Sequence, residues 1–376
     1  MPAWRLASRW GAGYSAAVPY DTWAEVAETR ILRILGRERV MSQHMFESKI
    51  SESGPVDQDP DSDAGEPSKS NQRAEPPHVT ASVRDLEDRG VLRRLPKAQA
   101  AARGFTHNVA LFVDETFDIS APSPSDEARL QRVIDGYAAW DFAASKTPLC
   151  GGVLENVVHV AALAAGPVTV VGDPGNDPHI PVNDTSLPES PADHVLGIGN
   201  ELVLVEDKNR RAWIYPSRTE IWTLLHRCLE TDCALPVLVA RKVPPAVLTF
   251  FKLIGALAFQ TNNQLFAAHL APDVHAPFRL VVAKAGLNFH DIRFADSGAA
   301  TALEERLTRF FKYTVAGEIT ARRALFREVA PILEYYADTF YKKGLPPDAY
   351  RECVTALKGG ELPGDFEPDY DDYEPF

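Results

Sequence analysis

The sequence predicts an α/β protein with a mixed sheet and flanking helices, and three patterns in its central part support this fold class. Two apolar segments, 195–198 and 201–206, flank a Gly-Asn pair that tolerates positive φ and suits a tight turn, so they predict a β-hairpin. An apolar helical pattern, 153–165, precedes the hairpin, and a continuous apolar strand, 236–240, follows it. A sheet with both faces covered by helices accounts for all three.

The elements before this region are predicted from periodicity and composition. Residues 20–38 have apolar residues at helical spacing and predict an amphipathic helix. Residues 47–80 are rich in Ser, Asp, Glu and Pro without a periodic apolar pattern, which predicts a disordered linker. Ordered structure is expected to resume at residues 83–95, followed by a strand around 109–113 and a helix around 126–142.

The central elements follow one another in a defined order. A short strand, 167–171, comes between the first helix and a proline-rich loop that leads to the hairpin. After the hairpin, Ser217 and Glu220 have the spacing of a capping box, which predicts a helix that ends near residue 230. The strand 236–240 comes next, and 247–259 continues as another helix or strand. The predicted order is α-β-β-β-α-β.

Charged residues lie at one end of the predicted hairpin. Asp193 begins its first strand, and Glu206, Asp207 and Lys208 end its second. Because side chains alternate along a strand, we expect Glu206 and Lys208 on one face and Asp207 on the other. Charges at the end of a buried strand are costly unless something compensates them. Carboxylates are the ligands that hard divalent cations prefer, so a metal site is the first hypothesis.

With these residues in place, residues 151–260 resemble the PD-(D/E)XK nuclease superfamily, which includes many restriction endonucleases and archaeal Holliday junction resolvases. The separation of 13 residues between Asp193 and Glu206 falls within the usual spread of that family. The resemblance implies a restriction-endonuclease-like α-β-β-β-α-β core. The matching residues are Glu155 on a helix, Asp193 at the start of a strand, and Glu206, Lys208 and Asn209 at the end of the next.

The resemblance also implies a chemistry: divalent-metal-dependent hydrolysis of nucleic-acid phosphodiesters, as in a DNA endonuclease. Asp193 and Glu206 would bind Mg²⁺ or Mn²⁺ together with the carbonyl oxygen of Asp207. Glu155 would reach the metal directly or through water. Lys208 would orient the attacking water and stabilise charge in the transition state.

Simpler explanations exist for each residue. Glu155 could have no role beyond stabilising a helix N-terminus electrostatically. Glu206 and Lys208 could form an ion pair at a sheet edge, and Asp193 could be a polar residue at a loop end. If the four do not converge, the alternative is a non-catalytic protein of nuclease fold that binds nucleic acid or a protein partner.

Two features depart from the family pattern. Asp207 occupies a position that family members usually fill with a small or apolar residue. It therefore needs a partner, for which Arg210 and Arg218 are candidates, or a place near the sheet edge. The loop before Asp193 is long and holds other acidic residues that compete with it as the first carboxylate. These competitors are Asp173, Asp177, Asp184 and Glu189.

The formal net charge of −13 comes from two segments. Residues 47–66 carry seven acids against one lysine, and residues 361–376 carry seven acids and no base, so the rest is neutral overall. The segment 208–242 is locally basic, as a polyphosphate ligand requires, although an ordinary solvated surface would look the same. The candidate nucleic-acid-binding residues are Arg210, Arg211, Arg218 and Lys242.

The C-terminal tip resembles the acidic tails of bacterial single-stranded DNA-binding proteins, which also end in Pro-Phe. That resemblance implies docking to a protein partner, whereas a solubilising tail is the simpler explanation. Covering of the basic groove by the tail as a DNA mimic is a further alternative. The residues concerned are Asp371, Asp372, Glu374, Pro375 and Phe376.

Four cysteines without a CxxC pair indicate a reducing compartment, and the longest apolar run is too short to cross a bilayer, so we expect a cytoplasmic protein without membrane contact. A homodimer is compatible with the sequence. Residues 1–46 are expected to form a helix or to precede the true translation start, and residues 47–80 to form a disordered linker. The globular domain is expected to begin with 81–150 and to continue with the nuclease-like core, 151–260. A mainly helical extension, 261–357, and a disordered acidic tail, 358–376, are expected to follow.

Overall fold

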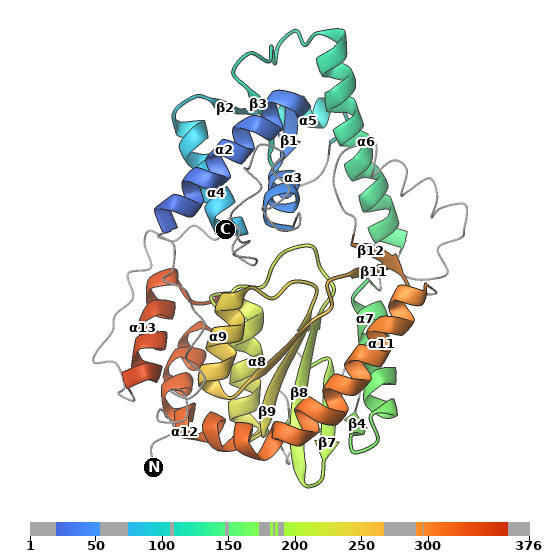
Figure 1. Cartoon of the computed structure of the whole chain (residues 1–376), viewed down its shortest axis with the longest axis vertical. Helices are drawn as coiled ribbons and strands as arrows, with labels where there is room; N and C mark the ends of the chain where they lie inside the picture. The colour runs from blue at the N-terminus through green and yellow to red at the C-terminus, as the bar shows by residue number, and fades with distance from the viewer. Residues whose placement is uncertain are drawn as a thin grey trace, which may run out of the picture. The chain divides into compact units, whose positions relative to one another are not determined.

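The computed structural model describes two compact units, and each is considered by itself (Figure 1). The described residues of the N-terminal unit end at Lys146, and those of the C-terminal unit begin at Cys150. No helix of the described residues is long and apolar enough to cross a membrane. The structure describes residues 20–52, 74–105, 109–146, 150–172, 181–182, 185–186, 192–266, 291–295 and 297–359.

The N-terminal unit packs two helices, α2 (Tyr20–Glu38) and α4 (Pro76–Asp88), beside a three-stranded antiparallel sheet. The strand order is β1 (Val40–Ser42), β3 (Leu111–Asp114) and β2 (Leu92–Arg94). Apolar side chains of both helices and all three strands are buried. The remaining elements are α3 (Gln43–Glu47), the π-helical turn η1 (Ser48–Glu52), α5 (Lys97–Ala102) and α6 (Pro124–Lys146).

The helix predicted over residues 20–38 is present with those bounds, whereas the segment predicted as a disordered linker, 47–80, has helical structure at both of its ends. Helical structure continues to Glu52 because Ile50 is buried in the unit, and α4 begins at Pro76, a favourable first helical residue. Residues 53–73 lie outside the described part. The segment predicted as the first part of the main domain joins residues 20–52 in a separate unit.

The C-terminal unit is built on a five-stranded mixed sheet with the order β10-β9-β8-β7-β4. β4, β7 and β8 pair antiparallel, whereas β8, β9 and β10 pair parallel. The predicted hairpin is confirmed: Ile198 pairs with Glu201 across a two-residue turn, in which Gly199 has φ +61°. The strands are β4 (Thr169–Gly172), β7 (His194–Ile198), β8 (Glu201–Lys208), β9 (Leu235–Ala240) and β10 (Leu257–Gln260).

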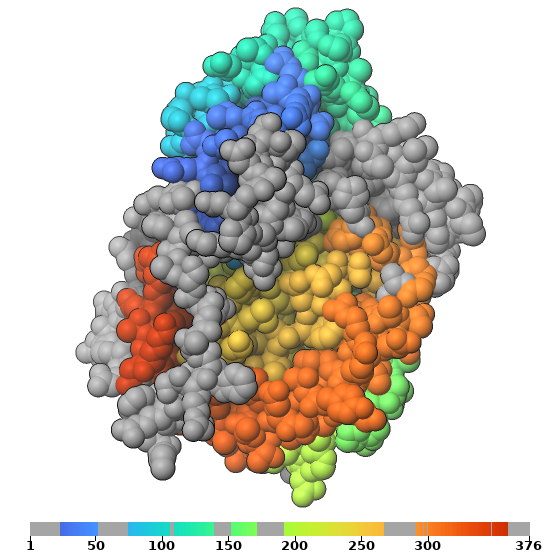
Figure 2. All heavy atoms as spheres, in the orientation of Figure 1, coloured from blue at the N-terminus to red at the C-terminus, as the bar shows by residue number. Residues whose placement is uncertain are grey.

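Helices cover both faces of this sheet (Figure 1). One face packs on α7 (Cys150–Ala164), α11 (Gly298–Arg309) and the π-helical turn η3 (Phe310–Val315). The other face packs on α8, α9, α12 and α13, and in Figure 2 the gold surface around α9 lies between the orange C-terminal helices and the red α13. These four helices are α8 (Thr219–Glu230), α9 (Pro245–Ile254), α12 (Ala316–Phe340) and α13 (Pro347–Gly359).

Apart from two short strands between β4 and β7, the element order α7-β4-β7-β8-α8-β9 agrees with the predicted α-β-β-β-α-β order. The segment 247–259, left open between helix and strand, contains the end of α9 and the start of β10. The helical region after residue 260 buries its apolar side chains against the same sheet, so it belongs to this unit. The smaller strands are β5 (Pro181–Val182), β6 (Thr185–Ser186), β11 (Gln264–Phe266) and β12 (Ile292–Phe294).

The capping box predicted for Ser217 and Glu220 is not formed. Helix α8 begins at Thr219, its N-cap residue is Arg218, and no side chain caps it. The Glu220 carboxylate instead forms an ion pair with Arg210, and the Ser217 carbonyl accepts a hydrogen bond from Leu345. Tertiary contacts have therefore replaced the local cap that the spacing suggested.

Candidate functional site

The candidate site lies at the carboxyl end of β8, beside the start of the antiparallel neighbour β7. Leu204 faces the core with α8 and α9, and Val203 and Val205 face the core with α7 and α11. Alternation then directs Glu206 and Lys208 to the α8 face, and their side chains meet with Nζ 2.5 Å from Oε1. Asp193 directly precedes β7 at the same end of the sheet.

Lys208 Nζ lies among three oxygen atoms. It is 2.5 Å from Glu206 Oε1, 3.0 Å from the carbonyl oxygen of Asp207 and 3.5 Å from Asp193 Oδ2. The backbone N–H of Asp207 also donates to Asp193 Oδ2 at 2.5 Å, which fixes that carboxylate against the end of β8. Two carboxylates and one carbonyl therefore surround a single positive charge. These are the oxygen donors that the sequence predicted for the metal.

Glu155 reaches this region from α7. Its carboxyl group is half-buried, and burial raises its pKa, which the nearby charges of Asp193 and Asp207 raise further. The positive charge of Lys208 acts in the opposite direction. The structure thus brings Asp193, Glu206 and Lys208 together. It places Glu155 within electrostatic reach of Asp193 and Lys208, outside the contacts that Lys208 makes.

Arg227 of α8 holds the second oxygen of Glu206, a contact that the sequence analysis missed. Its Nη1 lies 3.1 Å from Glu206 Oε2, and the two side chains are 5% and 8% exposed. Burial raises the pKa of Glu206, while Lys208 and Arg227 lower it. The sequence signal for this pair was a cationic residue in a helix whose other residues are largely buried. A positive charge in such a position requires an acidic partner.

Asp207 points to the opposite face of β8 and pairs with His194 of β7, and not with either of the candidate partners Arg210 and Arg218. His194 Nε2 lies 2.9 Å from Asp207 Oδ2, and both side chains are almost completely buried. Burial raises the pKa of Asp207, and His194 lowers it. The ring of His159, one helical turn after Glu155 on α7, has its centroid 6.1 Å from that of His194. A buried polar layer therefore lies behind the site.

Three of the four predicted nucleic-acid-binding residues are partly exposed near this end of the sheet. Arg210 pairs with Glu220, and Arg218 Nε lies 4.0 Å from the same carboxylate. Lys242 Nζ lies 3.3 Å from Asn262 Oδ1. The contacts of Arg218 and Lys242 are exposed and therefore weak, so these two side chains can exchange partners at low cost.

Arg211 has a different environment, because it is buried and shares Asp291 with Arg241. Their Nη1 atoms lie 2.5 Å and 2.6 Å from the two oxygens of Asp291. The two arginines hold the pKa of Asp291 below its ordinary value although burial opposes this. Asn209 also joins elements, since its amide group exchanges two hydrogen bonds with the backbone of Leu265. Arg211 and Asn209 thus attach β11 and Asp291 to the end of β8.

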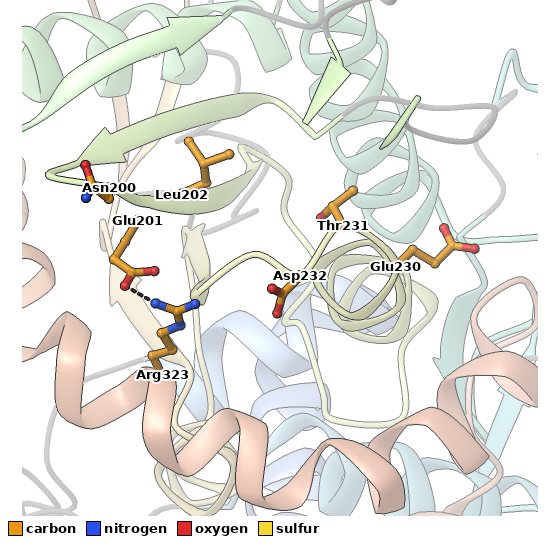
Figure 3. Close-up of a pocket in the computed structure, with 7 residues that line it drawn as sticks. All are labelled: Asn200, Glu201, Leu202, Glu230, Thr231, Asp232 and Arg323. Atoms are coloured by element: carbon orange, nitrogen blue, oxygen red, sulfur yellow. Dashed lines mark hydrogen bonds and ion pairs between the residues drawn. The ribbon is translucent and has the colours of Figure 1, made fainter. Parts of the chain in front are cut away.

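A polar pocket of about 330 Å³ lies at the other end of β8, beside the hairpin turn (Figure 3). Arg323 reaches across it to form an ion pair with Glu201, the first residue of β8. Lys208 is the last residue of the same strand, so the pocket is separate from the candidate site. Its lining residues are Asn200, Glu201, Leu202, Glu230, Thr231, Asp232 and Arg323.

Several predicted residues lie outside the described part of the chain, namely Asp173, Asp177, Asp184, Glu189 and the tail residues Asp371, Asp372, Glu374, Pro375 and Phe376. Within the described part, no group of three or more His, Cys, Asp or Glu residues is placed to hold a metal ion. The donor set around Lys208 consists of two carboxylates and a backbone carbonyl. Comparison with protein-family models, curated proteins and solved structures finds no match to this chain.

Proposed function

We propose that the C-terminal unit hydrolyses the phosphodiester bonds of nucleic acid, with DNA as the first substrate class, in a reaction that depends on Mg²⁺ or Mn²⁺. The observation that supports this best is the position of Lys208 Nζ among oxygens of Asp193, Glu206 and Asp207. These residues also occur in the α-β-β-β-α-β order that characterises the PD-(D/E)XK nucleases, which the sequence resembles.

The residues fit a hard divalent cation because all three donors are oxygens that already surround a positive charge. Asp193, Glu206 and the Asp207 carbonyl would hold the ion, and Glu155 would approach it directly or through water. When bound, the ion would polarise the phosphodiester and lower the pKa of a water molecule. Lys208 would donate hydrogen bonds to the attacking water and to the phosphoryl oxygens, which gain charge in the transition state. Arg227 would keep Glu206 Oε2 occupied, so that Oε1 remains directed into the site.

The test is cleavage of linear, nicked and single-stranded DNA with Mg²⁺ or Mn²⁺, comparing wild type with Asp193→Ala and Lys208→Ala. Two exposed residues of the same unit, Asp348 and Lys252, provide matched controls as Asp348→Ala and Lys252→Ala. We expect metal-dependent cleavage that is lost in both site variants and retained in both controls. Cleavage that survives both site substitutions would refute the proposal.

The second candidate is a non-catalytic protein of similar architecture that binds nucleic acid or a protein partner. It is favoured by the neutralisation of Asp193 and Glu206 by Lys208, a residue of the chain itself. For this candidate we expect DNA binding that is unaffected by chelators, without cleavage, in wild type and in Lys208→Ala. Measurements of DNA binding by fluorescence anisotropy, with and without EDTA, separate the two candidates.

A further inference from the structure

Glu206 is shared between two cations that differ in how firmly they are held. Arg227 contacts Oε2 from α8 and has a side chain only 5% exposed. Lys208 contacts Oε1 and has a side chain 22% exposed. The arginine is enclosed by the core on the α8 face, whereas the lysine lies on a flexible four-carbon stem at the end of a strand. Lys208 is therefore the cation that can leave.

Lys208 Nζ also lies where an ion bound by the three oxygens would lie. A divalent ion that binds Glu206 Oε1, Asp193 Oδ2 and the Asp207 carbonyl has to approach all three, and the ammonium group is already 2.5 to 3.5 Å from each. Two positive charges cannot share that space, because at a separation of a few ångströms their repulsion exceeds thermal energy several-fold in a partly buried site.

We propose that Lys208 is an exchangeable internal cation, which neutralises Asp193 and Glu206 in the metal-free protein and must leave the three oxygens before a divalent ion binds. The proposal rests on the proposed function, since it concerns the same metal site. Lys208 then has two successive roles: it compensates the buried carboxylates without metal and moves towards the substrate when metal enters.

The two roles predict opposite effects on metal affinity and on hydrolysis when the charge of Lys208 is removed. Replacing Lys208 by methionine keeps a similar apolar stem but removes the charge. Metal binding no longer has to displace an ammonium group, so affinity for the ion increases, whereas hydrolysis, which uses the ammonium group, is lost. A residue that only supports the fold or only contacts substrate would not increase metal affinity when it is removed.

The experiment is a titration of the full-length protein with Mn²⁺, followed by electron paramagnetic resonance of the free ion, for wild type, Lys208→Met and the exposed control Lys252→Met. We expect Lys208→Met to bind Mn²⁺ about tenfold more tightly than wild type, since a competing charge has been removed. Lys252→Met should match wild type. Equal or weaker binding by Lys208→Met would overturn the proposal.

A second measurement separates a change in metal binding from a folding defect of the variant. In thermal unfolding, Mn²⁺ should raise the midpoint of Lys208→Met more than that of wild type, because the metal-free variant lacks compensation for its carboxylates. Lys208→Gln, which keeps a hydrogen-bond donor without charge, should behave in the same way. If wild type cleaves DNA but wild type and Lys208→Met have equal Mn²⁺ affinities and equal shifts of the unfolding midpoint, only the exchange proposal fails. If no protein binds Mn²⁺ or cleaves DNA, the proposed function fails with it.

Discussion

Arg227 Nη1 lies 3.1 Å from Glu206 Oε2, and both side chains are buried between β8 and α8. The removal of one member of such a pair leaves the other charge without compensation in the core, which costs much more than the pair itself contributes. The position of Glu206 at the candidate site therefore depends on a residue of the next helix, 21 positions later in the chain.

Arg227→Met should destabilise the C-terminal unit by about 3 kcal/mol, because Glu206 then loses one of its two cations. Mn²⁺ should restore part of this stability by supplying positive charge at the other oxygen. The measurement is urea unfolding of wild type and variant, each with Mn²⁺ and with EDTA. The control is Arg218→Met, whose side chain is 38% exposed, and which should change stability little. Equal stability of Arg227→Met and wild type in EDTA would contradict the argument.

His194 and Asp207 should behave as one unit. His194→Leu and Asp207→Leu should each destabilise the protein by about 3 kcal/mol, since each leaves a buried polar partner unpaired. The double variant should be about 2 kcal/mol more stable than the sum of the two single effects predicts. Chemical denaturation of the four proteins in this cycle gives the coupling energy. Additive effects would show that the 2.9 Å contact contributes nothing specific.

Asp291 gives a prediction about pH. Because Arg211 and Arg241 lower its folded-state pKa, its ionised form contributes stability that is complete above the ordinary value of 3.8. That contribution is lost as pH falls through the lower folded-state pKa. Asp291→Asn should therefore be less stable than wild type by about 3 kcal/mol at pH 7, and the difference should shrink below pH 3.8.

Urea unfolding at pH 7, 5 and 3 measures this difference. Asp348→Asn is the control, because Asp348 is 85% exposed and should leave stability unchanged across the series. A deficit in Asp291→Asn that stays constant down to pH 3 would show that the carboxylate charge is not the cause.

Gly255 ends α9 with φ +79°, and a Cβ atom there would lie 2.5 Å from the carbonyl oxygen of Arg322 on α12. Gly255→Ala should destabilise the unit by more than about 2 kcal/mol, because positive φ and a backbone clash act together. Gly166 is the matched control, since it also has φ +79° but no atom of the described residues within 4 Å of a Cβ. Gly166→Ala should cost only the conformational part, about 1 kcal/mol. Thermal unfolding of both variants tests whether the clash adds to the strain.

The hairpin and its charged end could be predicted because local rules determine them. Gly199 and Asn200 set the turn, and alternation from Val203 to Val205 assigns Glu206 and Lys208 to one face of β8. The same register places His194 opposite Val205, near Asp207 on the other face. The sequence therefore held a signal for the His194–Asp207 pair, although only two arginines were considered as partners.

Contacts between distant segments could not be predicted in the same way. Glu220 has the spacing of a cap but pairs with Arg210, and Arg227 reaches Glu206 only once α8 is packed on β8. The separate N-terminal unit was also missed, because β1 and β3 are 69 positions apart at their closest and pairing over that distance leaves no periodic pattern. Long-range pairing of this kind depends on tertiary packing rather than on local propensity.

The contact between Gly255 and the backbone of Arg322 also bears on where the chain can be shortened. The residues after Gln260 include α12, whose side chains fill the core that α8 and α9 share. A protein that ended at the predicted boundary of 260 would expose that core and leave the closely fitted turn at Gly255 without its neighbour. We therefore expect the smallest soluble form of the sheet unit to retain α12, and limited proteolysis should yield no stable fragment that stops at the end of β10.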